Sequence, residues 1–194
     1  MTFQDRAYRT LVVSSSSKFL DNISQYLNDA QCNPISFASS ITDAKRMSME
    51  NPFDFIIINS PLPDELGAKF AIDVSAGKET VCLLLCRADL FEEIKAKVTP
   101  HGVFTLSKPI NATSIAQSLA FLAPARERLR KLEKKSLSLE EKMEEIRLVN
   151  KAKWLLIDHE QLSEPDAHRM IEKQAMDKCV LKGEIAKTII KKYE

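Results

Sequence analysis

The sequence predicts a parallel α/β domain, then a coiled-coil helix, then a small all-α module of three helices. Over the first 123 residues, short apolar runs alternate with amphipathic stretches. An apolar heptad repeat follows, and two helical segments with recognisable start and stop signals end the chain. The predicted domains are residues 1–123, a coiled-coil linker helix over 124–150, and the helical module over 146–194.

The α/β prediction depends on apolar runs that are continuous rather than alternating, as expected for strands buried on both faces. The strands are expected at Leu11–Val13, more weakly near Pro34–Phe37, and at Phe55–Ile58, Val81–Leu85 and Val103–Leu106. Helical spacing lies between them, at Lys18–Leu27, Ile41–Met49, Leu66–Val74, Leu90–Val98 and Asn111–Leu122. Five strands alternating with five helices predict a flavodoxin-like sheet, whose ligand sites lie at the carboxyl ends of the strands.

The heptad repeat predicts a coiled coil, for which a homodimer is the leading expectation, while a higher oligomer and either helix orientation remain open. Polar Ser136 and Asn150 share the repeat with the apolar positions, and such residues can fix the register. Pro124 can begin a new helix or kink a continuous one. The alternative is one long solvated helix that packs on its own domain. The residues expected in the homodimer interface are Leu122, Leu129, Leu132, Leu139, Met143 and Ile146.

Two further helices are predicted after the coiled coil. Ser163 can cap a helix from Glu164 to about Asp177, with Pro165 in its first turn. Gly183 is a poor residue for a helix interior, so the last helix is expected at Glu184–Lys192 after a bend. The three-helix core is expected to contain Ala152, Leu155, Leu156, Ala167, Met170, Ile171, Ala175, Met176, Ile185, Ala186 and Ile189.

Two segments of the first domain carry a resemblance. Residues 54–64 read Asp-Phe-Ile-Ile-Ile-Asn-Ser-Pro-Leu-Pro-Asp, and residues 107–110 read Ser-Lys-Pro-Ile. Over about 120 residues the domain resembles a bacterial response-regulator receiver. That family has its phosphoacceptor aspartate where this chain has Asn59, and its invariant lysine matches Lys108.

The residues needed for aspartyl phosphorylation are replaced. Asn59 has no ionised oxygen, Ser14 and Ser15 stand where the family has an acidic pair, and Cys86 stands where it has a switch hydroxyl. Phosphorylation of a carboxylate needs that carboxylate and a divalent cation held by further carboxylates. We therefore expect a degenerate receiver that is not phosphorylated at the usual position. A phosphorylation-controlled regulator would need another acceptor.

No enzyme, metal site or cofactor is predicted. The three histidines lie far apart, no metal-ligand spacing occurs, and Cys86 has no identifiable base. No apolar stretch approaches the length of a membrane span, the N-terminus lacks the apolar core of a signal peptide, and no C-x-x-C pair occurs. We expect a cytoplasmic protein without a membrane partner.

The last 50 residues or so carry a second resemblance. Ala152-Lys153, Leu162-Ser163-Glu164, Ala175-Met176 and Ala186 occur in an order and spacing similar to the ANTAR family. Trp154 departs from it, because a small residue is common there. Cys179 and Val180 also depart, because basic residues are frequent there. The resemblance implies binding of small hairpins in nascent leader RNA, so that transcription continues through a terminator.

Hairpin recognition needs cations for phosphates and polar or aromatic groups for loop bases. Lys153 is the leading single candidate, whereas Trp154 can equally belong to the core. For each basic residue, the alternative is that it lies on an ordinary solvated helix face and does not contact RNA. The candidate RNA-binding residues are Arg147, Lys151, Lys153, Trp154, His168, Arg169, Lys173, Lys178 and Lys182.

The arrangement of domains resembles that of amidase-operon antiterminators, which are controlled by a ligand-sensing regulatory protein instead of phosphate. The resemblance implies an RNA-binding antiterminator regulated by partner binding or oligomerisation. The alternative function is a protein-interaction adaptor that does not bind RNA. The net charge of +1 provides no overall basic field that would decide between them.

Overall fold

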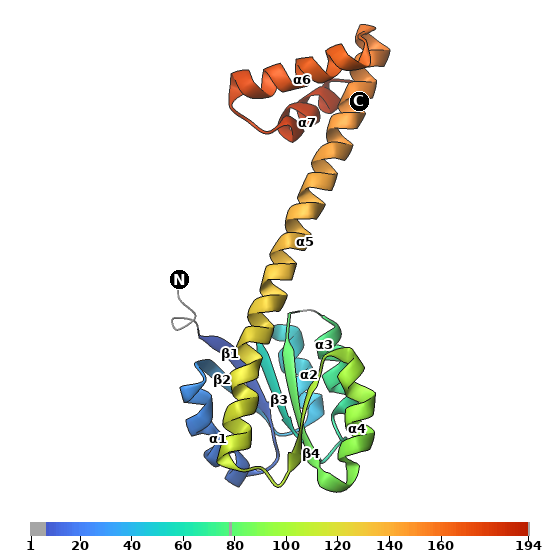
Figure 1. Ribbon diagram of the computed structural model, residues 1–194. Coiled ribbons are helices and arrows are strands. Elements are labelled where there is room, and N and C mark those ends of the chain that lie inside the picture. The colour runs from blue at the N-terminus through green and yellow to red at the C-terminus, as the bar shows by residue number, and fades with distance from the viewer. Residues whose placement is uncertain (1–6, 78, 194) are drawn as a thin grey trace. The chain divides into compact units, whose positions relative to one another are not determined.

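The computed structural model describes residues 7–77 and 79–193 (Figure 1). The chain divides into two compact units, residues 1–133 and 134–194. Residues 1–6, 78 and 194 of the predicted domains lie outside the described residues. Within the described ranges, no helix combines the length and the apolar character that crossing a membrane requires.

The first unit is a five-stranded parallel sheet with the strand order β2-β1-β3-β4-β5. This confirms the predicted flavodoxin-like fold. Its elements are β1 (Tyr8–Val13), α1 (Ser17–Asp29), β2 (Cys32–Ala38), α2 (Ile41–Glu50), β3 (Phe55–Asn59), α3 (Ala68–Ala76), β4 (Val81–Arg87), the 3₁₀ turn η2 (Ala88–Leu90), α4 (Phe91–Val98), the 3₁₀ turn η3 (Thr99–His101), β5 (Phe104–Lys108) and the first part of α5 (Ala112–Glu160).

Three helices begin later than predicted, and the one expected from Asn111 starts at Ala112. The helix expected from Leu66 starts at Ala68, because Gly67 precedes it with a left-handed φ of 76°. A side chain at Gly67 would also lie 2.9 Å from the Ile58 side chain. The helix expected from Leu90 starts at Phe91, since the 3₁₀ turn η2 occupies the residues before it.

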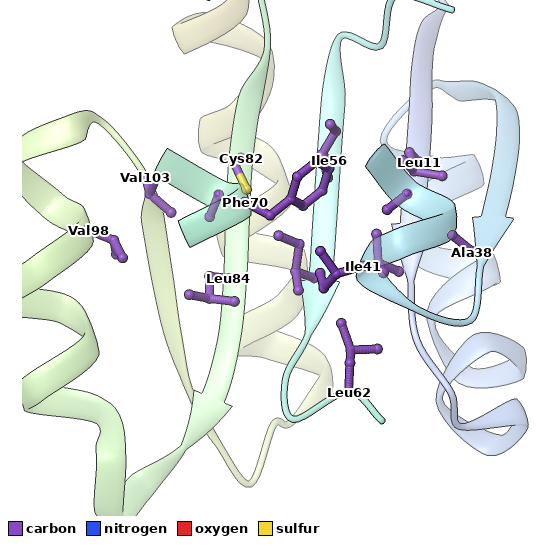
Figure 2. Close-up of a cluster of buried hydrophobic side chains, with 14 of the residues drawn as sticks. Leu11, Ala38, Ile41, Ile56, Leu62, Phe70, Cys82, Leu84, Val98 and Val103 are labelled. Atoms are coloured by element: carbon purple, nitrogen blue, oxygen red, sulfur yellow. The ribbon is translucent and has the colours of Figure 1, made fainter. Parts of the chain in front are cut away.

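Helices cover both faces of the sheet, which explains why its strands are apolar without alternation (Figure 1). On one face, side chains of α2, α3 and α4 pack against the sheet, including Ile41, Phe70 and Val98 around Ile56 and Leu84 (Figure 2). On the other face, α1 and α5 pack against the alternate strand residues. The sheet interior therefore contains almost no polar side chains.

Buried ion pairs hold α5 against the start of β3. Asp54 Oδ1 accepts from Arg126 Nε at 2.9 Å and from Arg130 at 2.7 Å. Asp54 Oδ2 accepts from the backbone N–H of Arg9 at 3.0 Å. Arg126 also pairs with Glu133 at 2.8 Å, and Arg130 pairs with Glu127 at 2.8 Å. Asp54 and Arg126 are each over nine-tenths buried, so these pairs are largely removed from water.

The second unit consists of residues 134–160 of α5, α6 (Glu164–Lys178) and α7 (Lys182–Tyr193). Ser163 caps α6 by accepting from the backbone N–H of Asp166 at 3.3 Å, as predicted. The three helices enclose a core of Val149, Ala152, Leu156, Ala167, Ile171, Ala175, Ile185, Ala186 and Ile189.

Three predictions for this unit are wrong, one of them at Leu155, which was expected in the core but is only partly buried and lies outside the core cluster. No bend separates Gly183 from the last helix: Gly183 lies in the first turn of α7, where its N–H donates to Glu145 of α5 at 3.3 Å. A side chain there would lie only 3.4 Å from Glu145 Cγ, so glycine permits close packing of the two helices. Met176 was expected in the core but is 77% exposed, while its neighbour Ala175 fills the core position.

Candidate functional site

The residues predicted to stand at a receiver's phosphorylation site lie at the carboxyl ends of the strands. Asn59 ends β3, and its side-chain amide donates to Ser14 Oγ at 2.9 Å. Lys108 ends β5, and its ammonium donates to the backbone carbonyl of Ser60. Cys86 is fully buried in β4, whereas Ser15 is exposed. The sequence therefore identified side chains that are neighbours at this edge.

Burial is the main influence on the pKa values of the titratable groups at this edge. Burial lowers the pKa of Lys108, and the nearby Cys86 thiol only partly opposes that shift. Burial raises the pKa of the Cys86 thiol, and Lys108 lowers it by less. Asn59 Oδ1 is buried without a hydrogen-bond partner among the described residues. Those residues include no group of three or more His, Cys, Asp or Glu side chains that could hold a metal ion.

The predicted dimer interface divides into two parts. Leu122 is fully buried in the core of the first unit and Leu129 is partly buried there, so both contribute to packing within one chain. This corrects the prediction at these two positions. In this part of the chain α5 packs on the sheet, and its apolar heptad positions face the sheet. The other predicted interface residues are 52% to 71% exposed: Leu132, Leu139, Met143 and Ile146.

Helix α5 is continuous through Pro124, which lies inside it. Of the two outcomes predicted for Pro124, the one in which it begins a new helix is therefore wrong. An exposed proline costs α5 one backbone hydrogen bond without ending it.

Three of the candidate RNA-binding residues are engaged by glutamates. Lys153 pairs with Glu164 of α6 at 2.9 Å, and only 16% of its side chain is exposed. His168 lies 3.3 Å from Glu172, and Lys182 pairs with the same carboxylate from α7. The Lys153–Glu164 and Lys182–Glu172 pairs join different helices, whereas His168 and Glu172 lie four residues apart within α6.

The remaining basic candidates are more open to solvent. Arg147 and Arg169 have side chains that are 83% and 80% exposed, with acidic neighbours only at 3.7 and 3.9 Å. Lys151, Lys173 and Lys178 are also exposed. Within the described part of the chain, Lys173 and Lys178 have no acidic partner within 4.0 Å.

Trp154 lies on the surface of the second unit. It is 71% exposed, so it is not a core residue of the folded chain. Arg147, Lys151 and Trp154 follow one another at i, i+4 and i+7 along α5, a spacing that places them on one helix face. This face presents two cations and an aromatic ring, the groups that single-stranded loop nucleotides require.

The family comparison decides what the second unit is. A family model described as the ANTAR domain matches residues 137–190. The second unit is an ANTAR domain. It contains every candidate RNA-binding residue named above, so the resemblance seen in the sequence is confirmed for the family.

A relative also aligns over most of the chain. The transcriptional regulatory protein PdtaR of Mycobacterium tuberculosis (strain H37Rv) is 20% identical over 183 residues, which cover 94% of this chain and 89% of the relative. Together with the ANTAR domain, this match supports a regulator of transcription antitermination. Both findings point to a regulatory rather than a catalytic class of protein.

Solved structures show the fold of the first unit. The signal receiver domain of an HD domain-containing protein from Pseudomonas fluorescens Pf-5 matches with a TM-score of 0.56 and 22% identity, over 69% of this chain and 97% of that chain. The chemotaxis response regulator CheY4 of Vibrio cholerae matches with a TM-score of 0.52 and 24% identity, over 60% of this chain and 99% of that chain. The ANTAR domain thus follows a receiver-like domain.

Proposed function

We propose that this protein binds hairpins in nascent leader RNA through its ANTAR domain and thereby prevents transcription termination. The observation that carries the proposal is the ANTAR match over residues 137–190. Hairpin loops offer phosphates and unstacked bases, which require cations and aromatic or polar groups. The face of α5 with Arg147, Lys151 and Trp154 supplies both, and Arg169 and Lys173 at i and i+4 supply a second cationic face on α6.

Lys153 has a different role in this proposal. Its side chain is mostly covered, and its ammonium pairs with Glu164 in the first turn of α6. Replacing Lys153 would therefore loosen the contact between α5 and α6 as well as remove a charge. Arg147 and Lys173 are better test positions, because both are exposed and belong to two different helices.

We further propose that the active form is a homodimer. Leu132, Leu139, Met143 and Ile146 succeed one another along α5 at spacings of seven, four and three residues. All four are more than half exposed, and a second copy of the helix would cover them. Two ANTAR domains in one dimer would bind paired hairpins more tightly than one, through a higher effective concentration.

Regulation without aspartyl phosphorylation completes the proposal. Asn59 stands at the acceptor position, and its amide is bonded to Ser14, which occupies a position where the receiver family has an acidic residue. An amide is not a nucleophile of the kind that forms an acyl phosphate. Control would then act through a partner protein, such as one that senses a ligand, or through the oligomeric state.

The test is binding of the full-length protein to a panel of short RNA hairpins at low and high salt. We expect binding that depends on the loop sequence and weakens with salt. Arg147→Ala and Lys173→Ala should each weaken it and lower the salt slope by about one. The matched control is Lys97→Ala, which removes an exposed lysine from α4 of the first unit. Folded protein that binds no hairpin would instead support the adaptor function.

The fluorescence of the single tryptophan provides a second measurement of hairpin binding. Trp154 is the only tryptophan in the chain and is largely exposed. Stacking on a loop base should change its fluorescence in proportion to the bound hairpin. A change that instead follows protein concentration without RNA would place Trp154 in contact with a second copy.

A further inference from the structure

The ANTAR domain has a second surface whose chemistry is unlike that of the proposed RNA-binding faces. A groove of about 730 Å³ lies between α5 and the start of α7. One wall is formed by α5 residues from Ser138 to Leu148, and the other by Leu181, Gly183, Glu184 and Lys187. Between the two walls, α7 approaches α5 closely at Gly183, whose backbone N–H donates to Glu145. We call this surface the acidic groove.

Carboxylates dominate the charge of the acidic groove. It is lined by two lysines, Lys142 and Lys187, and by five glutamates, so its formal charge is 2 − 5 = −3. Lys187 is already paired with Glu184 at 2.9 Å, and hydrogen bonding and attraction from Glu184, with a smaller contribution from Glu144, raise the pKa of Lys187. The glutamates that line the groove are Glu140, Glu141, Glu144, Glu145 and Glu184.

The acidic groove also exposes apolar surface. Leu181 is 72% exposed at its edge, while the partly buried Leu148 joins the groove to the domain core. Val180, immediately before Leu181, is 43% exposed. An apolar side chain of a partner can bury its surface against the exposed leucine. The surrounding carboxylates favour a partner with positively charged side chains.

We propose that the acidic groove docks a basic, amphipathic helical segment of a partner protein. RNA does not fit this surface, because every nucleotide would bring a phosphate toward a net negative charge. A helix with apolar residues on one face would cover Leu181 and Leu148, and its flanking lysines or arginines would meet the glutamates. The inference rests on the proposed function only in assigning RNA to the basic faces of the same domain.

A partner docked here would contact the domain that we propose binds RNA. One wall of the groove is helix α5 itself, which carries Arg147 between the groove residues Glu145 and Leu148 and carries Lys151 and Trp154 further on. The acidic groove is therefore the site at which we expect a partner protein to regulate the ANTAR domain.

The test measures binding of a fluorescein-labelled synthetic helical peptide, with leucines at heptad spacing and lysines elsewhere, to the full-length protein by fluorescence anisotropy. We expect saturable binding that weakens with salt and is lost with a scrambled peptide of the same composition. Leu181→Ser should weaken it by about tenfold, as expected for one buried leucine. The double variant Glu141→Lys, Glu144→Lys should weaken it at least as much. The matched control is Leu66→Ser, an exposed leucine of the first unit.

Hydrogen exchange of the full-length protein with the peptide should show protection over residues 138–148 and 181–187. Absence of peptide binding, equal binding by the Leu181→Ser variant, or competition by hairpin RNA would each overturn the proposal; competition would show that the groove belongs to the RNA surface. Leu181→Ser should leave hairpin affinity unchanged. A protein that binds the peptide but no hairpin would refute the proposed function and leave the groove proposal standing.

Discussion

The buried carboxylate of Asp54 allows a quantitative test of how the receiver-like unit holds α5. Asp54→Asn keeps the size of the side chain but removes the charge that Arg126 and Arg130 share. Breaking a buried ion pair costs about 3–5 kcal/mol when the remaining charge has no other partner. Here Arg126 keeps Glu133 and Arg130 keeps Glu127. We therefore expect a loss at or below the lower limit of that range, about 2–3 kcal/mol of unfolding free energy.

The assay is urea unfolding followed by far-UV circular dichroism. With a slope of about 2 kcal/mol per M, the midpoint should fall by roughly 1–1.5 M. The matched control is Asp89→Asn, which breaks an exposed pair with Arg87 and should cost less than about 1 kcal/mol. Trp154 belongs to the other unit, so its fluorescence separates unfolding of the two. If Asp54→Asn costs no more than Asp89→Asn, the buried network does not stabilise this unit.

Four further predictions each concern a change at a single residue. Ser163→Ala removes the cap of α6 and should destabilise the ANTAR domain by about 1 kcal/mol in thermal unfolding; an unchanged midpoint would argue against the cap. Leu139→Asp should convert the dimer to monomer in analytical ultracentrifugation, and a persistent dimer would refute the proposed interface. Asn59→Asp alone should not be labelled by acetyl phosphate, since the metal-binding carboxylates are also missing; stable labelling would show that they are not needed. Hydrogen bonds from the start of α2, that of the Thr42 N–H first, lower the pKa of Asp64 to about 2. Its folded pKa lies below the unfolded value, so the stability it contributes is present at neutral pH and should be lost from about pH 4 towards pH 2. In urea unfolding, the difference between wild type and Asp64→Asn should shrink over that range, and a constant difference would contradict the assignment.

The fold of the first unit was predictable because its signals are local. A strand such as Phe55–Asn59 is apolar at nearly every position, which few structures other than a covered parallel sheet require. The helix start at Ser163 was equally clear, because a capping side chain satisfies N–H groups within its own turn. Such signals depend on neighbours in sequence and not on the rest of the chain.

What the sequence could not reveal depends on contacts between helices. Gly183 looked like a break, but it is the residue that lets α7 approach Glu145. Lys153 looked like an RNA contact, yet a glutamate from the next helix covers it. Leu122 fitted the heptad repeat as well as Leu139 did, although one is buried in its own domain and the other is half exposed. Periodicity identifies an apolar face but not what covers it.

The receiver-like unit has a buried charge at the opposite end of β3 from Asn59. Asn59, at the carboxyl end, contributes an amide where a receiver has its acceptor carboxylate, while Asp54, just before the first residue of the strand, contributes a buried carboxylate. The charge at Asp54 is neutralised by two arginines of α5, the helix that continues into the ANTAR domain. The strongest buried ion pairs of this unit therefore lie away from Asn59, at the contact between Asp54 and α5. Strong electrostatic contacts remain where α5 leaves the sheet, and a partner that changes the position of α5 must act against them.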